Sequence, residues 1–257
     1  MSNYNSIRFK YDIETIKNKP SNNIPNFDNL IREDFLEVTK GVVPKIYNLV
    51  QSIKKQLKLE IEISTFILPN QSYGALCITD REKIKIFIYS GLVENFTLDE
   101  IRFVVAHEIG HQIFNHVPLN IAEITTSNML MNRCQEISAD RIGFFAIKDL
   151  SVVGQTIMKL LSGLSSKHLT KNFLPIFRQA KDFRNLDESS THPNLSLRLG
   201  AIIEFSMSKE YNLLCENKDK GSFSLEDVDK RIYQKIKNLD GEDFKKALYD
   251  QLNSSNN

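Results

Sequence analysis

The sequence predicts an α+β fold that is mainly helical, with a small mixed β-sheet beside one buried helix. Two observations support this prediction. Apolar residues recur every three or four positions along most of the 257-residue chain, which is typical of helices that bury one face. Between residues 60 and 90 the pattern changes to short alternating segments rich in isoleucine, which is typical of strands. The length favours one large domain, or one domain with extensions.

The segments before residue 90 predict helices followed by strands. Helical spacing runs from Phe27 to about Leu59, and Pro44 suits the first turn of a second helix within this region. The segment "EIEISTFIL" predicts a strand, and "SYGALCIT" and "KIKIFIYS", joined by the polar "DREK", predict a hairpin. The strand from Ile84 to Tyr89 is either an edge that could pair with an extended peptide or an ordinary internal strand.

The segments after residue 90 are predicted to be mostly helical. Thr97 and Glu100 form the pattern of a capping box, which predicts the start of a helix. Later helices are expected at about Leu119 to Lys148, at about Val152 to Leu164, and from "THPNLSLRLGAIIEF" onward. The predicted organisation is a loosely attached polar extension over residues 1–27, a domain over 28–210, and a charged helical extension over 211–257.

Composition favours a soluble, cytoplasmic protein. The chain has 33 basic and 32 acidic residues, and this balance argues against a nucleic-acid partner. Three widely spaced cysteines do not resemble a disulfide framework, so reduced thiols are the simpler interpretation. The N-terminus lacks the apolar core of a signal peptide. No apolar run reaches the roughly 20 residues that span a bilayer, so no membrane span is expected.

The stretch "VVAHEIGHQIFNH", residues 104–116, carries the chemistry of a metal site. Histidines four apart share one helix face, so His107 and His111 could bind one ion. Glu108 points elsewhere around the helix but could contact a water that the ion holds, which is the zincin arrangement. The alternative is two incidental surface histidines. The surrounding residues are apolar, and burial of two imidazoles and a carboxylate costs several kcal/mol unless they are paired or metal-bound.

A catalytic zinc usually has three protein ligands, so a third must come from elsewhere. A histidine six residues after His111 would fit the metzincins, but that position is Val117. His116 is one residue off and would point well around a continuous helix, so a structural or surface role is favoured for it.

Glu136, in "CQEISADRIGFF", is the better candidate for the third ligand. It lies about 25 residues downstream, which is far enough for an antiparallel helix to return past the metal. Asp140 is one turn later on the same face and could accept a hydrogen bond from a ligand histidine. The alternative is a solvated helix face on which both carboxylates pair with Arg133 and Arg141.

The segments "HEIGH", "EISAD" and "STHPNLSLRL" together resemble the M48 family of zinc metallopeptidases, over roughly residues 60–205. The resemblance implies a zincin-like fold and a gluzincin-type site with one Zn²⁺ per chain on His107, His111 and Glu136. It also implies that His192 and Arg198 stabilise the oxyanion. The alternatives are a helix cap for His192 and a solvated side chain for Arg198.

The function expected from these features is that of a soluble zinc-dependent metalloendopeptidase. It would hydrolyse peptide bonds in proteins or peptides through a zinc-bound water that Glu108 activates. The alternative is a catalytically silent zinc-binding module that acts through protein–protein interaction, but such a module has no need of a general base. A non-proteolytic zinc hydrolase would need a cysteine ligand from a glycine-rich turn, and neither Cys77 nor Cys134 has that setting.

Overall fold

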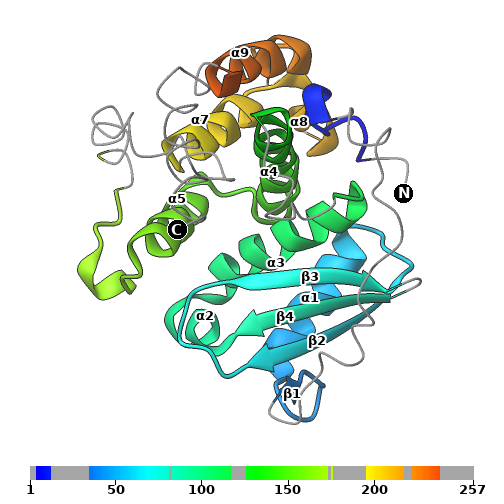
Figure 1. Ribbon diagram of the computed structural model, residues 1–257, viewed down its shortest axis with the longest axis vertical. Coiled ribbons are helices and arrows are strands. Elements are labelled where there is room, and N and C mark those ends of the chain that lie inside the picture. The colour runs from blue at the N-terminus through cyan, green and yellow to red at the C-terminus, as the bar shows by residue number, and fades with distance from the viewer. Residues whose placement is uncertain are drawn as a thin grey trace, which may run out of the picture. The chain divides into compact units, whose positions relative to one another are not determined.

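The structure is a computed structural model and describes residues 4–12, 35–80, 83–116, 126–172, 175, 195–216 and 221–237. It has the predicted α+β fold, in which helices accompany a small mixed sheet (Figure 1). The chain divides into two compact units. The first, here the sheet unit, comprises residues 1, 16–116 and 139–171, and the second, here the helical unit, comprises residues 2–15, 117–138 and 172–257. The domain boundaries predicted from the sequence stay predictions.

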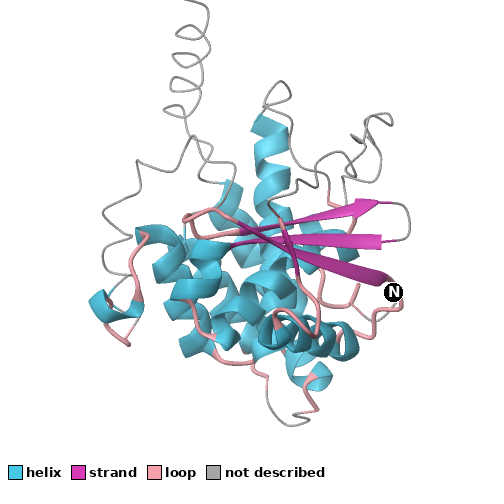
Figure 2. Ribbon diagram, turned by 90° about the horizontal axis from the view of Figure 1, so that it is seen from below, coloured by secondary structure: helices cyan, strands magenta, loops and turns pink. Residues whose placement is uncertain are grey.

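The sheet contains four strands in the order β1-β2-β4-β3 (Figure 1). Figure 2 draws the strands in magenta. Strands β2 and β4 are parallel, whereas β1 pairs with β2 and β3 pairs with β4 in antiparallel fashion. The hairpin predicted from "DREK" is therefore confirmed. The bounds of the strands are β1 Leu36–Glu37, β2 Glu62–Leu68, β3 Ala75–Asp80 and β4 Lys83–Tyr89.

Strand β4 is internal, so the hypothesis that residues 84–89 form the edge is wrong. Both neighbours of β4 are strands, and its residues from Ile84 to Ile88 are buried. The edge beside β4 is β3. The helix predicted from the spacing of apolar residues is also wrong at Leu36 and Glu37, which form a short strand paired with β2. The part of that predicted helix before residue 35 lies outside the described residues.

The sheet unit also contains several helices. They are α1 Pro44–Gln56, α2 Ser90–Asn95, α3 Leu98–Ile113, α5 Leu150–Ser162, the 3-10 turn η5 Ser166–His168, and the second half of α4 Thr126–Ile147. Helix α3 runs along β3 (Figure 1). Its start is the predicted capping box: the Thr97 amide donates to Glu100 Oε2 at 2.7 Å, and the Glu100 amide donates to Thr97 Oγ1 at 3.3 Å.

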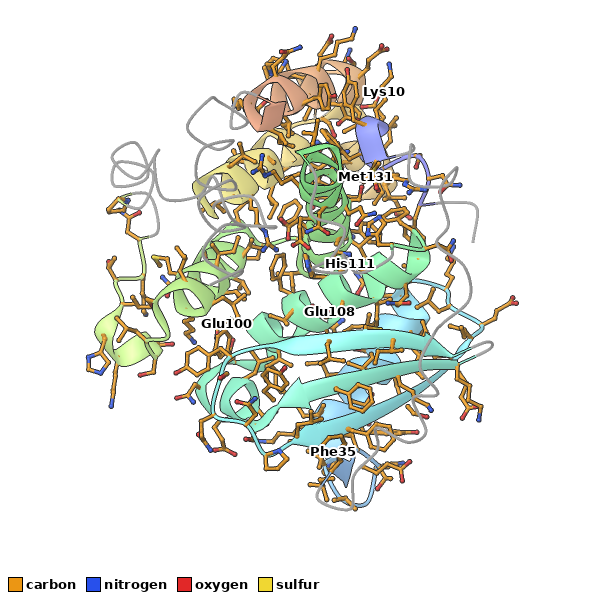
Figure 3. All side chains as sticks on the ribbon, in the orientation of Figure 1. Lys10, Phe35, Glu100, Glu108, His111 and Met131 are labelled. Carbon is orange, nitrogen blue, oxygen red and sulfur yellow. The ribbon has the colours of Figure 1, made fainter. Side chains whose placement is uncertain are left out.

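A buried ion pair fixes the start of α3 against α5. Lys159 Nζ lies 2.6 Å from Glu100 Oε2 and also donates to the Asn95 carbonyl at 3.1 Å. The ammonium group stands over the Phe96 ring, 4.8 Å from its centroid. A buried charge is tolerated only when partners of this kind replace water. The Glu100 carboxylate therefore both caps α3 and binds Lys159 of α5. Figure 3 labels Glu100 at this end of α3.

Two glycines allow α3 and α4 to approach closely. A Cβ atom on Gly110 would lie 3.1 Å from Ala139 Cα and from Ile142 Cβ. On the other helix, a Cβ atom on Gly143 would lie 3.0 Å from the Phe103 carbonyl oxygen and 2.9 Å from its ring. Larger side chains at these positions would push the helices apart. The glycine inside "HEIGH" therefore serves the packing that places α4 beside the two histidines.

The helical unit holds the first half of α4 together with α7 Leu195–Ser206, α8 Lys209–Leu214 and α9 Leu225–Lys237. Residues 4–12, which end in the 3-10 turn η1 Lys10–Asp12, also belong to it. The expectation that the N-terminus is loosely attached is wrong for these residues. Ile7, Phe9 and Asp12 are fully buried, and Ser138 of α4 donates to Asp12 Oδ2 at 2.6 Å.

None of the helices in the described ranges is both long enough and apolar enough to cross a membrane.

Candidate metal centre

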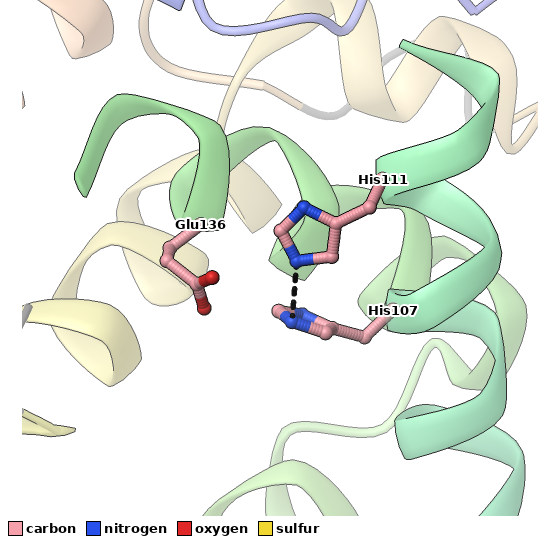
Figure 4. Close-up of side chains that lie close together, drawn as sticks. All are labelled: His107, His111 and Glu136. Atoms are coloured by element: carbon pink, nitrogen blue, oxygen red, sulfur yellow. Dashed lines mark hydrogen bonds between the residues drawn. The ribbon is translucent and has the colours of Figure 1, made fainter. Parts of the chain in front are cut away.

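Helix α3 presents two imidazoles to one point. His107 and His111 are one turn apart, and their Nε2 atoms lie 3.1 Å from each other (Figure 4). The rings are almost perpendicular, with an interplanar angle of 81°. His107 is buried and His111 is partly exposed. The two side chains lie on the same face of the helix because they are four residues apart.

Asp140 orients the first of these imidazoles. Its Oδ1 lies 2.9 Å from His107 Nδ1, and both side chains are buried. A carboxylate accepts the hydrogen of Nδ1, which leaves Nε2 without a hydrogen and with its lone pair directed away from Asp140. His107 Nε2 is therefore set up as a metal ligand.

Glu136 supplies the carboxylate of the cluster. It lies one turn before Asp140 on the continuous helix α4, so the two side chains share one helix face. One ligand atom each from His107, His111 and Glu136 lie within 4.8 Å of one another. Figure 4 shows the Glu136 carboxylate directed toward the two imidazoles. Arg198 of α7 reaches the same carboxylate, with Nη1 3.5 Å from Glu136 Oε2.

These residues fit a zinc ion in chemistry, and the two imidazoles also fit it in spacing. Two histidines and one carboxylate are a donor set found in catalytic zinc sites, which keep a further position open. Two nitrogens that each lie about 2.0–2.1 Å from a tetrahedral ion are about 3.3 Å apart. The observed separation of 3.1 Å between the Nε2 atoms is close to that value. A thiolate-ligated hydrolase would require a cysteine ligand. This group of three residues contains none.

Glu108 lies on the side of α3 that faces the edge strand β3. Burial raises the pKa of the Cys77 thiol on β3 well above its usual range, and the negative charge of Glu108 raises it further. Gln112, one turn after Glu108, donates to the Cys77 carbonyl at 3.0 Å and fixes α3 against β3. Figure 3 labels Glu108 and His111 on this helix. The charge of Glu108 therefore acts on the edge strand β3.

The structure decides several of the alternatives that the sequence left open. Glu136 and Asp140 are 4% and 1% exposed, so they do not form a solvated face. Arg198 is not a solvated side chain either, because it contacts Glu136. His116 is buried against His111, which excludes a surface role. His192 lies outside the described residues.

Comparison with known proteins agrees with the motifs. Residues 75–131 match the model of Peptidase family M48. The match contains β3, β4, α2, α3 and the "HEIGH" segment, and it ends before Glu136. The plastoglobule-localized metallopeptidase 48, chloroplastic, of Arabidopsis thaliana is 28% identical over 219 residues, which cover 72% of this chain and 63% of that relative. No solved structure matches. The family match and this relative, together with the α+β fold, show that the chain is similar to peptidase family M48.

Proposed function

We propose that the protein is a zinc-dependent metalloendopeptidase that hydrolyses peptide bonds in proteins or peptides. The observation that carries the proposal is the cluster of His107, His111 and Glu136 on two helices, with Glu108 on the same helix as the histidines. The similarity to peptidase family M48 supports the reaction class. The alignment covers only 63% of the Arabidopsis relative, so the substrate and partners of this chain are proposed and are not taken from that protein.

The positions of the side chains support the following proposed roles. His107, His111 and Glu136 would hold one zinc ion, which when bound polarises the scissile carbonyl and lowers the pKa of a water. Glu108 takes the proton of the attacking water and later delivers it to the leaving amine. Asp140 holds the His107 ring in the orientation that directs Nε2 into the site.

Arg198 is proposed to stabilise the negative charge that develops on the carbonyl oxygen. Its guanidinium lies 3.5 Å from Glu136 and is only 13% exposed, so its charge acts close to the cluster in a poorly solvated place. His192 is proposed for the same task on the motif resemblance alone.

Substrate is proposed to lie along β3. An extended peptide can add only to a sheet edge, and β3 is the edge strand next to α3. A peptide on β3 would pass Glu108, whose charge acts on Cys77 of that strand. The cytoplasmic location expected from the cysteines stays a prediction.

The test is cleavage of casein, an unfolded protein, by the purified chain. We expect internal cleavage that stops when a chelator removes the metal and returns when one equivalent of zinc is added. Mass spectrometry of the fragments would identify the cleaved bonds. Bound zinc without cleavage of casein or of a varied peptide library would instead favour a silent zinc-binding module.

A further inference from the structure

His116 lies against His111 because α3 ends in a tight C-terminal turn. The last helical residue is Ile113, and Asn115 adopts φ +55°, in the left-handed region. Asparagine is among the few residues other than glycine that tolerate this conformation. The His116 amide then donates to the His111 carbonyl at 2.9 Å, and the Asn115 amide donates to the Gln112 carbonyl at 3.2 Å. This pair of hydrogen bonds is the Schellman motif.

The turn places the His116 ring directly on the metal-facing histidine. His116 Nδ1 lies 2.8 Å from His111 Nδ1, and the ring planes meet at 71°. His116 is buried, and the Phe114 ring packs against it with centroids 5.7 Å apart. In a Schellman motif this position usually makes an apolar contact with the helix. Here the His116 imidazole occupies that position and directs a ring nitrogen to His111.

A metal-binding imidazole needs a hydrogen-bond acceptor on its far side. The nitrogen that binds an ion carries no hydrogen, so the other ring nitrogen must carry one and is best satisfied by a partner. His107 has Asp140 as that partner. His111 directs Nε2 toward His107 Nε2, so its Nδ1 faces His116. The two candidate ligands therefore have matching outer partners, one a carboxylate and one an imidazole.

We infer that His116 is a positioning residue of the metal centre, which accepts the Nδ1 hydrogen of His111 and so holds His111 Nε2 toward the ion. The inference rests on the proposed function, because it takes His111 as a ligand. Loss of an outer partner typically lowers metal affinity by about 10- to 100-fold. The ligand set itself remains, so the site weakens without disappearing.

The test measures the zinc dissociation constant by competition with a chromophoric chelator. His116→Leu fills the same space without an acceptor and is expected to bind zinc about 10- to 100-fold more weakly. His116→Asn can place an amide oxygen near the former Nδ1 position and is expected to recover most of the affinity. His168→Leu removes an exposed histidine in η5 and serves as the matched control, with unchanged affinity.

A second pair of variants tests the turn without changing His116. Asn115→Gly keeps the left-handed conformation and should preserve zinc affinity. Asn115→Val disfavours that conformation and should weaken binding, because His116 is then displaced. These variants also serve if His116→Leu fails to fold, which circular dichroism of the metal-free protein would show.

The outcomes separate this inference from the proposed function. Wild-type protein that binds no zinc would overturn the metal centre itself. Wild-type affinity in His116→Leu would overturn the inference alone. Equal weakening in His116→Leu and His116→Asn would also overturn it, since packing rather than the acceptor would then matter.

Discussion

Glu108→Gln is expected to retain zinc and to cleave casein about 10²- to 10⁴-fold more slowly than the wild-type protein. Glutamine has almost the same shape as glutamate but cannot take a proton from water. Glu108 is not in the cluster of three ligand atoms, so metal affinity should not change. Initial rates of fragment appearance and zinc content of the same preparations provide the measurement.

Glu94→Gln is the matched control for this change. Glu94 lies on α2, and its side chain is exposed. The substitution removes the same charge outside the cluster, so it should leave the rate unaltered. Full activity in the Glu108→Gln protein would mean that another group accepts the proton, and the role proposed for Glu108 would be wrong.

Glu136→Ala is expected to lower zinc affinity by more than the roughly 100-fold upper bound for loss of an outer partner. It removes one of three ligands, and it also removes the acceptor that Arg198 contacts. Activity should fall with the metal and return only partly at high zinc concentration.

Glu136→Gln separates the two effects, since its amide oxygen keeps a weak ligand and occupies the same volume. We expect its affinity to lie between those of Glu136→Ala and the wild-type protein. Glu94→Ala should bind zinc normally. Equal zinc affinity in Glu136→Ala and Glu94→Ala would show that the third ligand lies elsewhere.

The parts of the fold and site that depend on local patterns could be predicted from the sequence. The i, i+4 spacing of His107 and His111 fixes their common face on any helix. The capping box at Thr97 and Glu100 marks where that helix begins. Glu136 and Asp140 share a face for the same reason as the histidines.

The contact between His116 and His111 could not be predicted from a continuous helix. Five residues after His111, a helical side chain would indeed point away. The helix instead ends at Ile113, and the left-handed Asn115 turns the chain back. Asn115 was the available signal for a helix end, since asparagine is the usual alternative to glycine in the left-handed position after a helix.

Features that depend on distant pairing could not be predicted. The alternating pattern of β4 is the same in an edge strand and an internal strand, and only the parallel pairing with β2 makes it internal. The buried residues Ile7 and Phe9 lie in a segment too short to show any period. Their environment is set by α4, through bonds such as that from the Phe9 amide to Ser138 Oγ at 3.1 Å.

The most direct test of the metal centre is a crystal structure of the zinc-loaded protein, with anomalous diffraction recorded on both sides of the zinc absorption edge. We predict one anomalous peak per chain, about 2.0–2.1 Å from the Nε2 atoms of His107 and His111 and about 2.0–2.2 Å from a carboxylate oxygen of Glu136. A folded, zinc-loaded protein in which those three side chains do not share the ion would contradict the account.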